Sequence, residues 1–457
     1  MALSTRSREL AFLLPGAVVG IVGAASVASA GADELRAGPV PVVAIVAGLF
    51  LLMHIALRMR APEADPYLLP LVGTITALGL VTLYRINPDL ARDQVLWLAV
   101  ATAVFVGVLV VLPDHHLLER YRYILGVTAV VLLLVTMVFG TEINGARLWI
   151  QLPGGQTVQL GEIVKVLLVL FLAGYLRDKR ELLAVPTRAI GGVPMPPIAV
   201  LGPMLLLVGL ALALVVVLND FGTALLFFGV FLAMLYVAAG RGAYVGVGLG
   251  IFMAGSLAVW LAVPRIQDRV DTWLHPFDDP QGRGYQLVQS LYAFADGGLL
   301  GPGWGEGFLI RADGSSVIPV LDTDFIYTAV AAELGFIGAL ALLCLFVLLI
   351  ARGFTIAAAA PDGFSKLLAV GLTAVVGLQA FIIIGGVVRL IPLTGVTLPF
   401  MSYGGSSVVT NFAIVALLAV VSHRTRRPYR PRARRSGEAW KRAAVPAGYP
   451  GEEDEDE

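Results

Sequence analysis

The sequence predicts an all-α polytopic membrane protein with about twelve transmembrane helices. Hydrophobic residues make up 58% of the 457 positions and charged residues only 14%, with a mean hydropathy of +0.85. A soluble globular chain carries about 25% charged residues. Apolar runs also recur at the length of about 20 residues that a spanning helix needs. Composition and run length therefore both predict a chain that resides in a lipid bilayer.

Twelve apolar runs are long enough to be spans. They lie near 9–30, 40–59, 68–86, 95–113, 121–140, 160–177, 198–218, 221–239, 243–264, 325–351, 365–390 and 401–422. We interpret the first run as a span rather than a cleaved signal peptide, because it continues to about residue 30.

Lysine and arginine are concentrated in every second connection between these runs. The rich connections carry Arg58, Arg60, Arg120, Arg122, Arg177, Lys179, Arg180, Arg188, Arg241, Arg352 and Lys366. The positive-inside rule assigns such loops to the cytoplasm. We therefore expect a multi-pass protein of the cytoplasmic (inner) membrane with both termini cytoplasmic. The tail, 426–457, mixes arginines with a final "GEEDEDE" and is predicted to be a disordered cytoplasmic tail.

Three connections fall outside the membrane in this orientation: 141–159, 265–324 and 390–400. Loops longer than about 12–15 residues are usually functional or disordered. The long one mixes aromatics, glycines and prolines with an apolar stripe that begins at Leu287. We expect it to form short helices and turns that pack on the outer membrane face.

Several carboxylates lie at or inside the ends of spans, where ionisable groups are costly. Glu162 and Lys165 share one helix face, either as a simple ion pair or as part of a cavity. Asp220 either caps the next helix or belongs to a site. Glu333 lies deep enough in its span to require a buried partner or a cavity. Asp324, just before the run at 325–351, is either a helix N-cap or a functional carboxylate.

Cations gather on the same outer side, namely Arg147, Lys165, Arg265, Arg269 and Arg389. Such a set suits a phosphate-bearing substrate. A carboxylate among them suits general-base work on a hydroxyl or metal ligation. The simpler interpretations are a solvated loop cation for Arg147 and interfacial anchors for Arg265 and Arg269.

The remaining motifs are weaker signals of function. The histidines and the single cysteine, Cys344, form no cluster with metal-ligand spacing, and His115 and His116 fall in a predicted cytoplasmic loop. The glycine-rich "GPGWGEG" follows no strand and is a weak phosphate-loop signal. The hydroxyls of "SYGGSS", which include Ser406 and Ser407, can satisfy backbone groups or bind a headgroup.

Longer motifs resemble one family. The runs "GYQLVQSLYAFADGGLLGPGWGEG", "TDFIYTAVAAELGFIG" and "LIPLTGVTLPFMSYGGSS" are similar to those of the SEDS proteins of bacterial cell-wall synthesis, RodA, FtsW and their sporulation relatives. "NGARLWI", "QLGEIVK" and "DFGTALL" match in order. The resemblance covers roughly 68–425. It implies a ten-helix core at 68–425, preceded by two extra transmembrane helices at 1–67 that look most like actinobacterial RodA proteins, and followed by the tail.

The resemblance implies a peptidoglycan glycosyltransferase. Such enzymes polymerise lipid II, an undecaprenyl-pyrophosphate disaccharide-pentapeptide, at the outer face of the cytoplasmic membrane, for cell elongation and shape in the RodA branch. They work with a class B penicillin-binding protein. Asp324 of the T-D-F motif would be catalytic, with a divalent cation (Mg or Mn) as a further expectation. We expect no organic cofactor and no nucleic-acid partner. The residues expected to bind substrate are Arg147, Glu162, Lys165, Asp220, Arg265, Arg269, Gln286, Gln289, Ser290, Glu333, Ser406 and Ser407.

Three alternatives stay open, and one of them is a purely structural scaffold that recruits a penicillin-binding protein. A lipid II flippase has the same polytopic character, although transporters usually show internal repeats and broken helices. An FtsW-like division polymerase would share every motif with a RodA-like enzyme.

Overall fold

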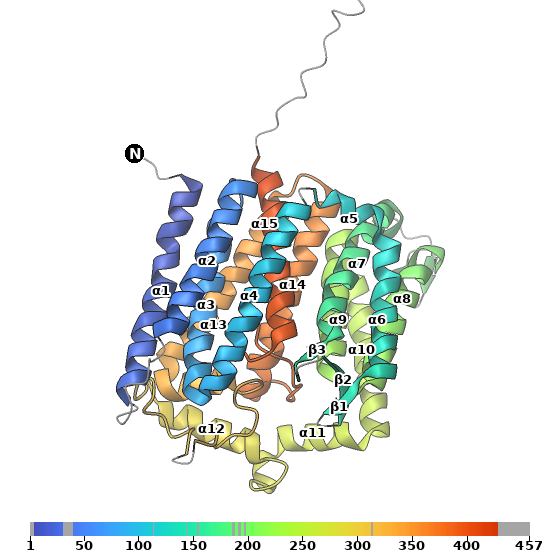
Figure 1. Ribbon diagram of the computed structural model, residues 1–457. Coiled ribbons are helices and arrows are strands. Elements are labelled where there is room, and N and C mark those ends of the chain that lie inside the picture. The colour runs from blue at the N-terminus through green and yellow to red at the C-terminus, as the bar shows by residue number, and fades with distance from the viewer. Residues whose placement is uncertain are drawn as a thin grey trace, which may run out of the picture.

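A bundle of long helices forms the body of the protein (Figure 1). The computed structural model describes residues 4–30, 40–112, 114–143, 145–152, 155–184, 188–190, 193–195, 198–311 and 314–427. Most of the predicted tail, from residue 428, lies outside the described residues. Each of the twelve predicted runs forms a helix, which confirms the all-α polytopic fold.

The long helices are α1 (Thr5–Ala30), α2 (Val40–Arg60), α3 (Leu68–Ile86), α4 (Pro88–Val111), α6 (Arg122–Phe139), α7 (Leu160–Ala184), α8 (Ile198–Val217), α9 (Phe221–Ala239), α10 (Gly242–Ala262), α13 (Ile326–Ala359), α14 (Gly363–Val387) and α15 (Gly405–Arg426). Eleven of them are long and apolar enough to cross a membrane. The exception is α7, which carries Glu162 and Lys165 in its first turns but packs against α6, α9 and α14. The count of twelve spans stays a prediction.

Capping residues explain where several helices begin. Asn87 accepts hydrogen bonds from the backbone N–H groups of Asp89 (2.9 Å) and Leu90 (3.4 Å), with Pro88 in the first turn. This cap starts α4 seven residues before the expected span. Asp362 caps α14 in the same way through the N–H of Ser365, at 2.9 Å. Gly240 ends α9 in the left-handed conformation, with φ +67°.

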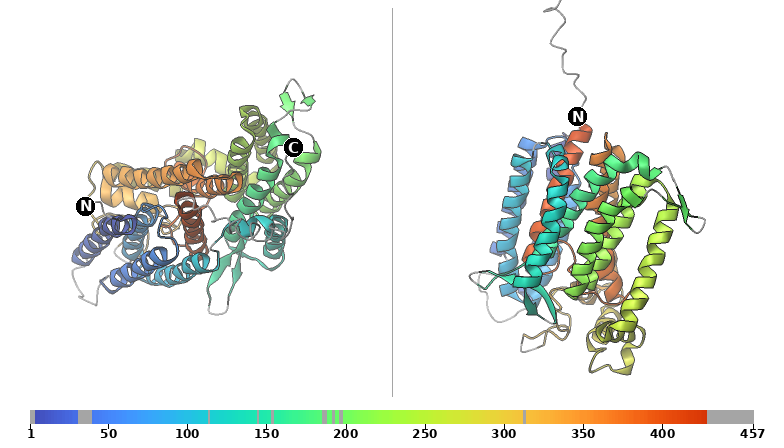
Figure 2. Two further views of the ribbon diagram at one scale, coloured as in Figure 1. Left: turned by 90° about the horizontal axis from the view of Figure 1, so that it is seen from above. Right: turned by 90° about the vertical axis from the view of Figure 1, so that its right-hand side faces the viewer.

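The bundle has two distinct ends (Figures 1 and 2). The terminal end holds the start of α1, the end of α15 and the short helix α5 (His116–Arg120). The loop end holds the described residues of 140–159, 218–220, 264–325 and 388–404. Contacts within it join all three segments that were predicted to lie on one side: the Arg265 guanidinium donates to the Gly145 carbonyl at 2.6 Å, and the Tyr403 N–H donates to the Asp322 carbonyl at 2.9 Å.

Short elements build the loop end. A three-stranded antiparallel sheet contains β1 (Thr141–Ile143), β2 (Ala146–Gln151) and β3 (Thr157–Gln159) in that order, with Ile150 opposite Val158. The predicted all-α fold includes no such sheet. The long connection contains α11 (Pro264–Leu274), the 3-10 turn η1 (Pro276–Asp278) and α12 (Tyr285–Gly297), as the predicted short helices and turns. A second hairpin pairs β4 (Arg188–Ile190) with β5 (Val193–Met195).

Helix α13 is broken at Gly335, whose φ of +66° and ψ of −169° are not helical. The backbone N–H groups of Phe336 and Ile337 donate instead to the carbonyls of Gly298 (2.9 Å) and Leu299 (3.1 Å), in the turn after α12. The predicted span at 325–351 is therefore divided. Residues 326–333 are all buried, and the longer part, 336–359, has an exposed face.

The most buried helices lie at the centre of the bundle. Of the best spanning window, 78% is buried in α3 and α15 and 83% in α14, whereas the window of α10 has no buried residue. An apolar cavity of about 270 Å³ lies between α1, α2 and α3 and is lined by residues such as Leu13, Val46 and Tyr84. Its lining carries no charged side chain, so it offers no chemistry.

Candidate active site

Asp324 lies in a tight turn directly before α13. Val320, a β-branched residue with φ +55°, accepts hydrogen bonds at its carbonyl from the N–H groups of Thr323 (3.2 Å) and Asp324 (3.0 Å). The Ser402 hydroxyl donates to the Thr323 carbonyl at 2.6 Å. A β-branched residue in the left-handed region is strained and persists only where the surroundings enforce it. The loop before α15 therefore holds the Asp324 turn in place.

The interpretation of Asp324 as a helix cap is wrong. The N-cap of α13 is Phe325, and no side chain caps the helix. Asp324 is half-buried as a residue. The role of this side chain must be sought in its surroundings rather than in helix initiation.

Charges around Asp324 oppose one another. Burial raises the pKa of Asp324 to about 6, and the nearby Asp322 carboxylate acts in the same direction. The Thr323 hydroxyl and the Arg269 guanidinium lower the pKa of Asp324. Burial, followed by the neighbouring Arg265, lowers the pKa of Arg269, which nevertheless remains charged because arginine is effectively always protonated.

Asp220 shares this neighbourhood. Its side chain accepts a hydrogen bond from the Thr223 N–H at 3.0 Å, which confirms the prediction of an N-cap for α9. Burial raises the pKa of Asp220, and the Glu162 charge adds to that effect while Arg269 opposes it. The residue before it, Asn219, has φ +62°. Arg269 thus influences two carboxylates from different helix starts.

Arg269 forms no ion pair within 4.0 Å with Asp220 or Asp324, as far as the described chain shows. The three charges are near enough to affect one another, yet none is neutralised by direct contact. Such an arrangement leaves a guanidinium fork and a carboxylate able to bind a ligand that carries both negative charge and a hydroxyl.

A buried polar chain runs from α7 to α15. The Lys165 ammonium contacts the Glu162 carboxylate at 2.6 Å, so the predicted ion pair is confirmed, and donates to the Gln379 side-chain oxygen at 2.7 Å. The Gln379 amide donates to the Thr397 carbonyl at 2.9 Å. The Thr397 hydroxyl in turn donates to Ser407 Oγ at 2.9 Å. This chain fixes the loop before α15 beside α7.

The segment at 388–404 packs across the loop end. Arg389, with φ +64°, donates to the Trp273 carbonyl at 2.7 Å, and the Trp273 indole donates back to the Arg389 carbonyl at 3.1 Å. Gly395 has φ +76°, and a Cβ there would lie 3.6 Å from the Asp324 carboxylate oxygen Oδ2. Arg389 therefore anchors α11, and Gly395 leaves room over Asp324.

Two predicted cations lie at the sheet. Arg265 binds the Gly145 carbonyl at the turn between β1 and β2. Arg147 lies on β2 opposite Glu142 and is exposed. Whether they contact substrate stays a prediction.

Glu333 lies elsewhere, at the break in α13. Its carboxylate pairs with Arg85 of α3 at 3.4 Å, which confirms the expected buried partner. The Glu333 carbonyl accepts from the Gly303 N–H at 2.9 Å, and Arg85 also donates to the Gly305 carbonyl at 2.9 Å. Glu333 and Arg85 thus hold the glycine-rich "GPGWGEG" loop, and a substrate contact for Glu333 stays a prediction.

The remaining predicted residues are polar contacts of α12 and α15. Ser290 is fully buried and bonds the Thr328 hydroxyl at 2.8 Å, which joins α12 to the first part of α13. Gln286 and Gln289 are half-buried on α12. Ser406 accepts a hydrogen bond from the Gln159 N–H at 2.9 Å, which joins α15 to β3.

Sequence reasoning missed several amides of the site region. Gln379 and Asn411 are fully buried, and Asn411 donates to Ser407 Oγ at 3.1 Å. Gln94 donates to the Ser402 carbonyl at 2.9 Å and accepts from the Gly404 N–H at 3.2 Å. Gln379 and Asn411 are uncharged polar residues inside apolar runs, and that is the signal that could have identified them, whereas Gln94 directly precedes its run.

The surroundings of Asp324 do not form a ready cage for a divalent cation. Three His, Cys, Asp or Glu ligand atoms come close enough to hold a metal at one place in the described chain, Asp114–His115–His116 at the terminal end. Beside Asp324 the nearest opposite charge is the Arg269 guanidinium. We therefore derive no step through a metal, and the expected Mg or Mn requirement stays a prediction.

The chain is similar to known proteins over most of its length. The family model described as "Cell cycle protein" (FtsW, RodA and SpoVE) matches residues 67–427. The chain is 42% identical over 400 residues to "Peptidoglycan glycosyltransferase RodA" of Mycobacterium tuberculosis (strain ATCC 25618 / H37Rv), covering 84% of each chain. It is 33% identical to "Stage V sporulation protein E" of Bacillus subtilis (strain 168), covering 80% of this chain and all of that one.

Solved structures are similar as well. One, described as "Structural coordination of polymerization and crosslinking by a peptidoglycan synthase complex", aligns with a TM-score of 0.64 at 29% identity, over 80% of this chain and 99% of that one. The crystal structure of the Thermus thermophilus rod shape determining protein RodA aligns with a TM-score of 0.56 at 27% identity, over 80% and 98%.

Proposed function

The chain belongs to the FtsW/RodA/SpoVE family of cell cycle proteins and is a peptidoglycan glycosyltransferase, and on this premise we propose that it polymerises lipid II at the outer face of the cytoplasmic membrane. The observation that supports this best is the half-buried Asp324, whose charge Arg269 influences although the two form no ion pair within 4.0 Å in the described chain. The similarity to mycobacterial RodA favours a role in elongation and cell shape.

In the proposed reaction, Asp324 accepts the proton of the sugar 4-hydroxyl on an incoming lipid II. That oxygen then bonds the anomeric carbon of the growing chain with inversion, while the bond from this carbon to the lipid pyrophosphate oxygen breaks. A base matched to the working pH is most effective, and a pKa of about 6 leaves most of Asp324 ionised at neutral pH. Arg269 would stabilise the negative charge that develops on the departing pyrophosphate.

The buried chain of Glu162, Lys165, Gln379 and Thr397 would act by positioning. It joins α7 and α14 to the loop that covers Asp324 and so fixes the height of Gly395 over the carboxylate. A misplacement of about 1 Å can cost about 10²-fold in rate, so rigid support of this kind matters to catalysis.

We also propose a partner and an orientation. One structural relative belongs to a complex described as coordinating polymerization and crosslinking. By analogy this chain would work with a class B penicillin-binding protein that crosslinks its product. The arginine-rich helix ends would face the cytoplasm, together with both termini, and the loop end would face outward. Co-purification from native membranes tests the partner, and repeated recovery of a fully active chain alone would contradict it.

Lipid II flipping remains a second candidate because α13 is broken at Gly335, a feature of many transporters. The position of the polar groups weighs against it, since Asp220, Arg269 and Asp324 gather at one end of the bundle rather than across it.

One assay separates the two functions. The purified chain, with a transpeptidase-inactive partner, is given lipid II in detergent, and glycan polymer is measured on gels. In parallel, the chain is placed in vesicles and the movement of labelled lipid II between leaflets is measured. Polymer is expected. Lipid movement without polymer would refute the proposed polymerase.

A further inference from the structure

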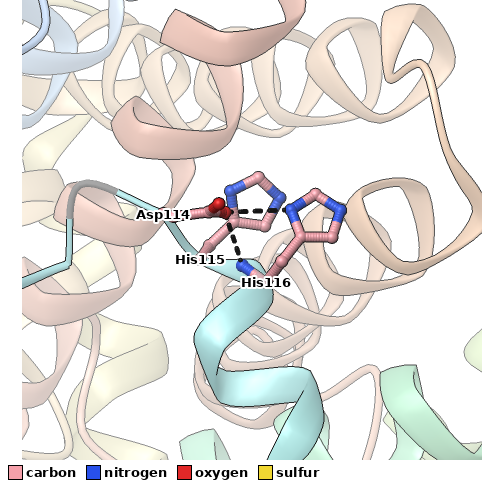
Figure 3. A group of neighbouring side chains, drawn as sticks. All are labelled: Asp114, His115 and His116. Carbon is pink, nitrogen blue, oxygen red and sulfur yellow. Dashed lines mark hydrogen bonds and ion pairs between the residues drawn. The ribbon is translucent and has the colours of Figure 1, made fainter.

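A cluster of three potential metal ligands lies at the terminal end of the bundle, at the start of α5. Asp114, His115 and His116 each offer one ligand atom, and these atoms all lie within 4.8 Å of one another (Figure 3). Side chains of successive residues normally diverge, by about 100° on a helix. Here the two imidazole rings lie on the same side, with centroids 4.5 Å apart.

His115 carries the second, independent observation. The residue is completely buried, and its Nε2 bonds Ser365 Oγ at 2.6 Å. The Ser365 hydroxyl donates its own hydrogen to Asp362 Oδ2 at 2.6 Å, so Ser365 Oγ must accept from Nε2–H. In the neutral ring Nδ1 is then a bare acceptor, and it has no hydrogen-bond partner in the described chain. A buried lone pair without a partner normally costs stability.

The support for His115 is typical of a metal ligand. Ligating histidines usually donate their second ring nitrogen to an oxygen that is itself hydrogen-bonded, and this contact fixes the tautomer and the ring orientation. The relay from His115 through Ser365 to Asp362 has that form, and Asp362 is held in turn as the N-cap of α14.

Asp114 and His116 complete the set and leave an opening. The His116 Nδ1 lies 3.1 Å from Asp114 Oδ1, and both side chains are partly exposed, so an ion can enter from solvent. Tetrahedral ligands of zinc at about 2.0–2.1 Å lie roughly 3.3–3.5 Å apart, so ligand atoms that lie up to 4.8 Å apart must approach by at most about 1.5 Å on binding.

We propose that Asp114, His115 and His116 form a binding site for one divalent transition-metal ion of the Zn²⁺ type. Two imidazoles and one carboxylate are donors that such ions prefer, and three protein ligands leave a position for water. The site is remote from the proposed reaction. A bound ion would fix the link between α4 and α6 against the start of α14.

Two features oppose binding. Arg424 contacts Asp114 Oδ2 at 2.7 Å and must move aside or share that carboxylate. The Nε2 of His116 also lies 3.3 Å from Asp362 Oδ2, so a protonated His116 could bridge two carboxylates without any metal. These features define the variants that test the site.

The experiment uses the full chain, purified without an affinity tag, stripped with a chelator and titrated with Zn²⁺ against a chromophoric competitor. Elemental analysis of the dialysed protein gives the stoichiometry. One ion per chain is expected for the parent. Asp114→Asn and His116→Gln should each bind at least about 100-fold more weakly, whereas Arg424→Gln should bind more tightly because the competing cation is gone. The matched control is His275→Gln, which removes an exposed histidine at the loop end and should bind as the parent does.

Folding is checked separately. Each stripped variant should elute as one peak and unfold near the parent temperature. Zn²⁺ should raise the unfolding temperature of the parent and of the His275→Gln variant, but should raise that of His116→Gln only slightly. If Asp114→Asn fails to fold, the visible d–d spectrum of the Co²⁺-loaded parent and the Arg424→Gln affinity decide the matter. The site is refuted if the parent binds no stoichiometric ion, or if binding is unchanged in folded Asp114 and His116 variants.

Discussion

Two carboxylates at the terminal end of the bundle are paired directly with cations, whereas Asp220 and Asp324 at the loop end have no ion-pair partner within 4.0 Å in the described chain. At the terminal end, Asp65 forms ion pairs with both Arg352 and Arg426. Glu9 similarly contacts Arg6 and, at 2.6 Å, His54. At the loop end, the nearest cation to Asp324 influences its charge without approaching within 4.0 Å, as far as the described residues show.

Backbone strain follows the same division. The non-glycine residues with positive φ in the described chain are Asn219, Val320, Arg389 and Phe400, and all lie at the loop end. Such conformations cost of order 1–3 kcal/mol each and tend to occur at functional sites. The Asp65 and Glu9 pairs therefore hold helices together at the terminal end, whereas Asp220, Arg269 and Asp324 stay without direct pairing in an enforced geometry at the loop end.

The strongest test of this contrast removes the charge of Asp324. Asp324→Asn should lower the polymerisation rate about 10²–10⁴-fold, as expected for a lost general base. The neighbouring Asp322→Asn is the matched control and should lose far less. Rates come from gel quantification of glycan. Near-parent activity of Asp324→Asn would show that the unpaired carboxylate is not the base.

A smaller loss is expected when the shared cation is removed. Arg269→Gln should reduce the rate by about 10²-fold, the usual effect of removing one preorganised charge-stabilising donor. The control is Arg283→Gln, an exposed arginine of the same connection that pairs with Asp268 and should stay within about twofold. Equal losses in both variants would mean that Arg269 acts only through general surface charge.

The terminal end should respond in stability rather than in rate. Asp65→Asn keeps an acceptor for the Tyr67 N–H but leaves two arginines without their carboxylate. We expect a loss of about 1–3 kcal/mol in the free energy of unfolding, below the range for fully buried pairs because both arginines are partly exposed. Thermal unfolding followed by size-exclusion chromatography measures it. A large fall in turnover of the folded variant would break the contrast.

The smallest effect concerns pH. Because the base must be ionised and its pKa is about 6, the rate should be roughly tenfold lower at pH 5 than at pH 7. A raised carboxyl pKa means that the folded state binds this proton more tightly than the unfolded chain, so Asp324 does not destabilise the fold as pH falls. Arg269→Gln should shift the acid limb to higher pH. A flat profile between pH 5 and pH 7 would contradict the assignment.

Hydropathy alone located all twelve long helices, because each apolar run is long enough to be recognised without knowledge of its neighbours. It could not locate the sheet, since β1 and β3 have only three residues each and their pairing depends on neighbours. The Asp114–His115–His116 cluster was also missed, because adjacent side chains are not expected to converge. A sequence motif was enough to identify Asp324. The position of Arg269 near it, without a direct ion pair, could not be predicted, because Arg269 belongs to α11, which is distant from Asp324 in the sequence.

The break at Gly335 also bears on how the chain fits a bilayer. A straight helix of 34 residues would be about 51 Å long, far beyond a hydrocarbon layer of about 30 Å, and such mismatch is relieved only by tilting or by deforming the lipid. Residues 336–359 alone measure about 36 Å, which needs only a modest tilt. The break at one glycine thus divides a single apolar run into a short buried segment that follows Asp324 and a longer segment whose length matches the lipid. A Gly335→Ala chain should consequently prefer thicker membranes, which reconstitution in lipids of graded acyl length would show.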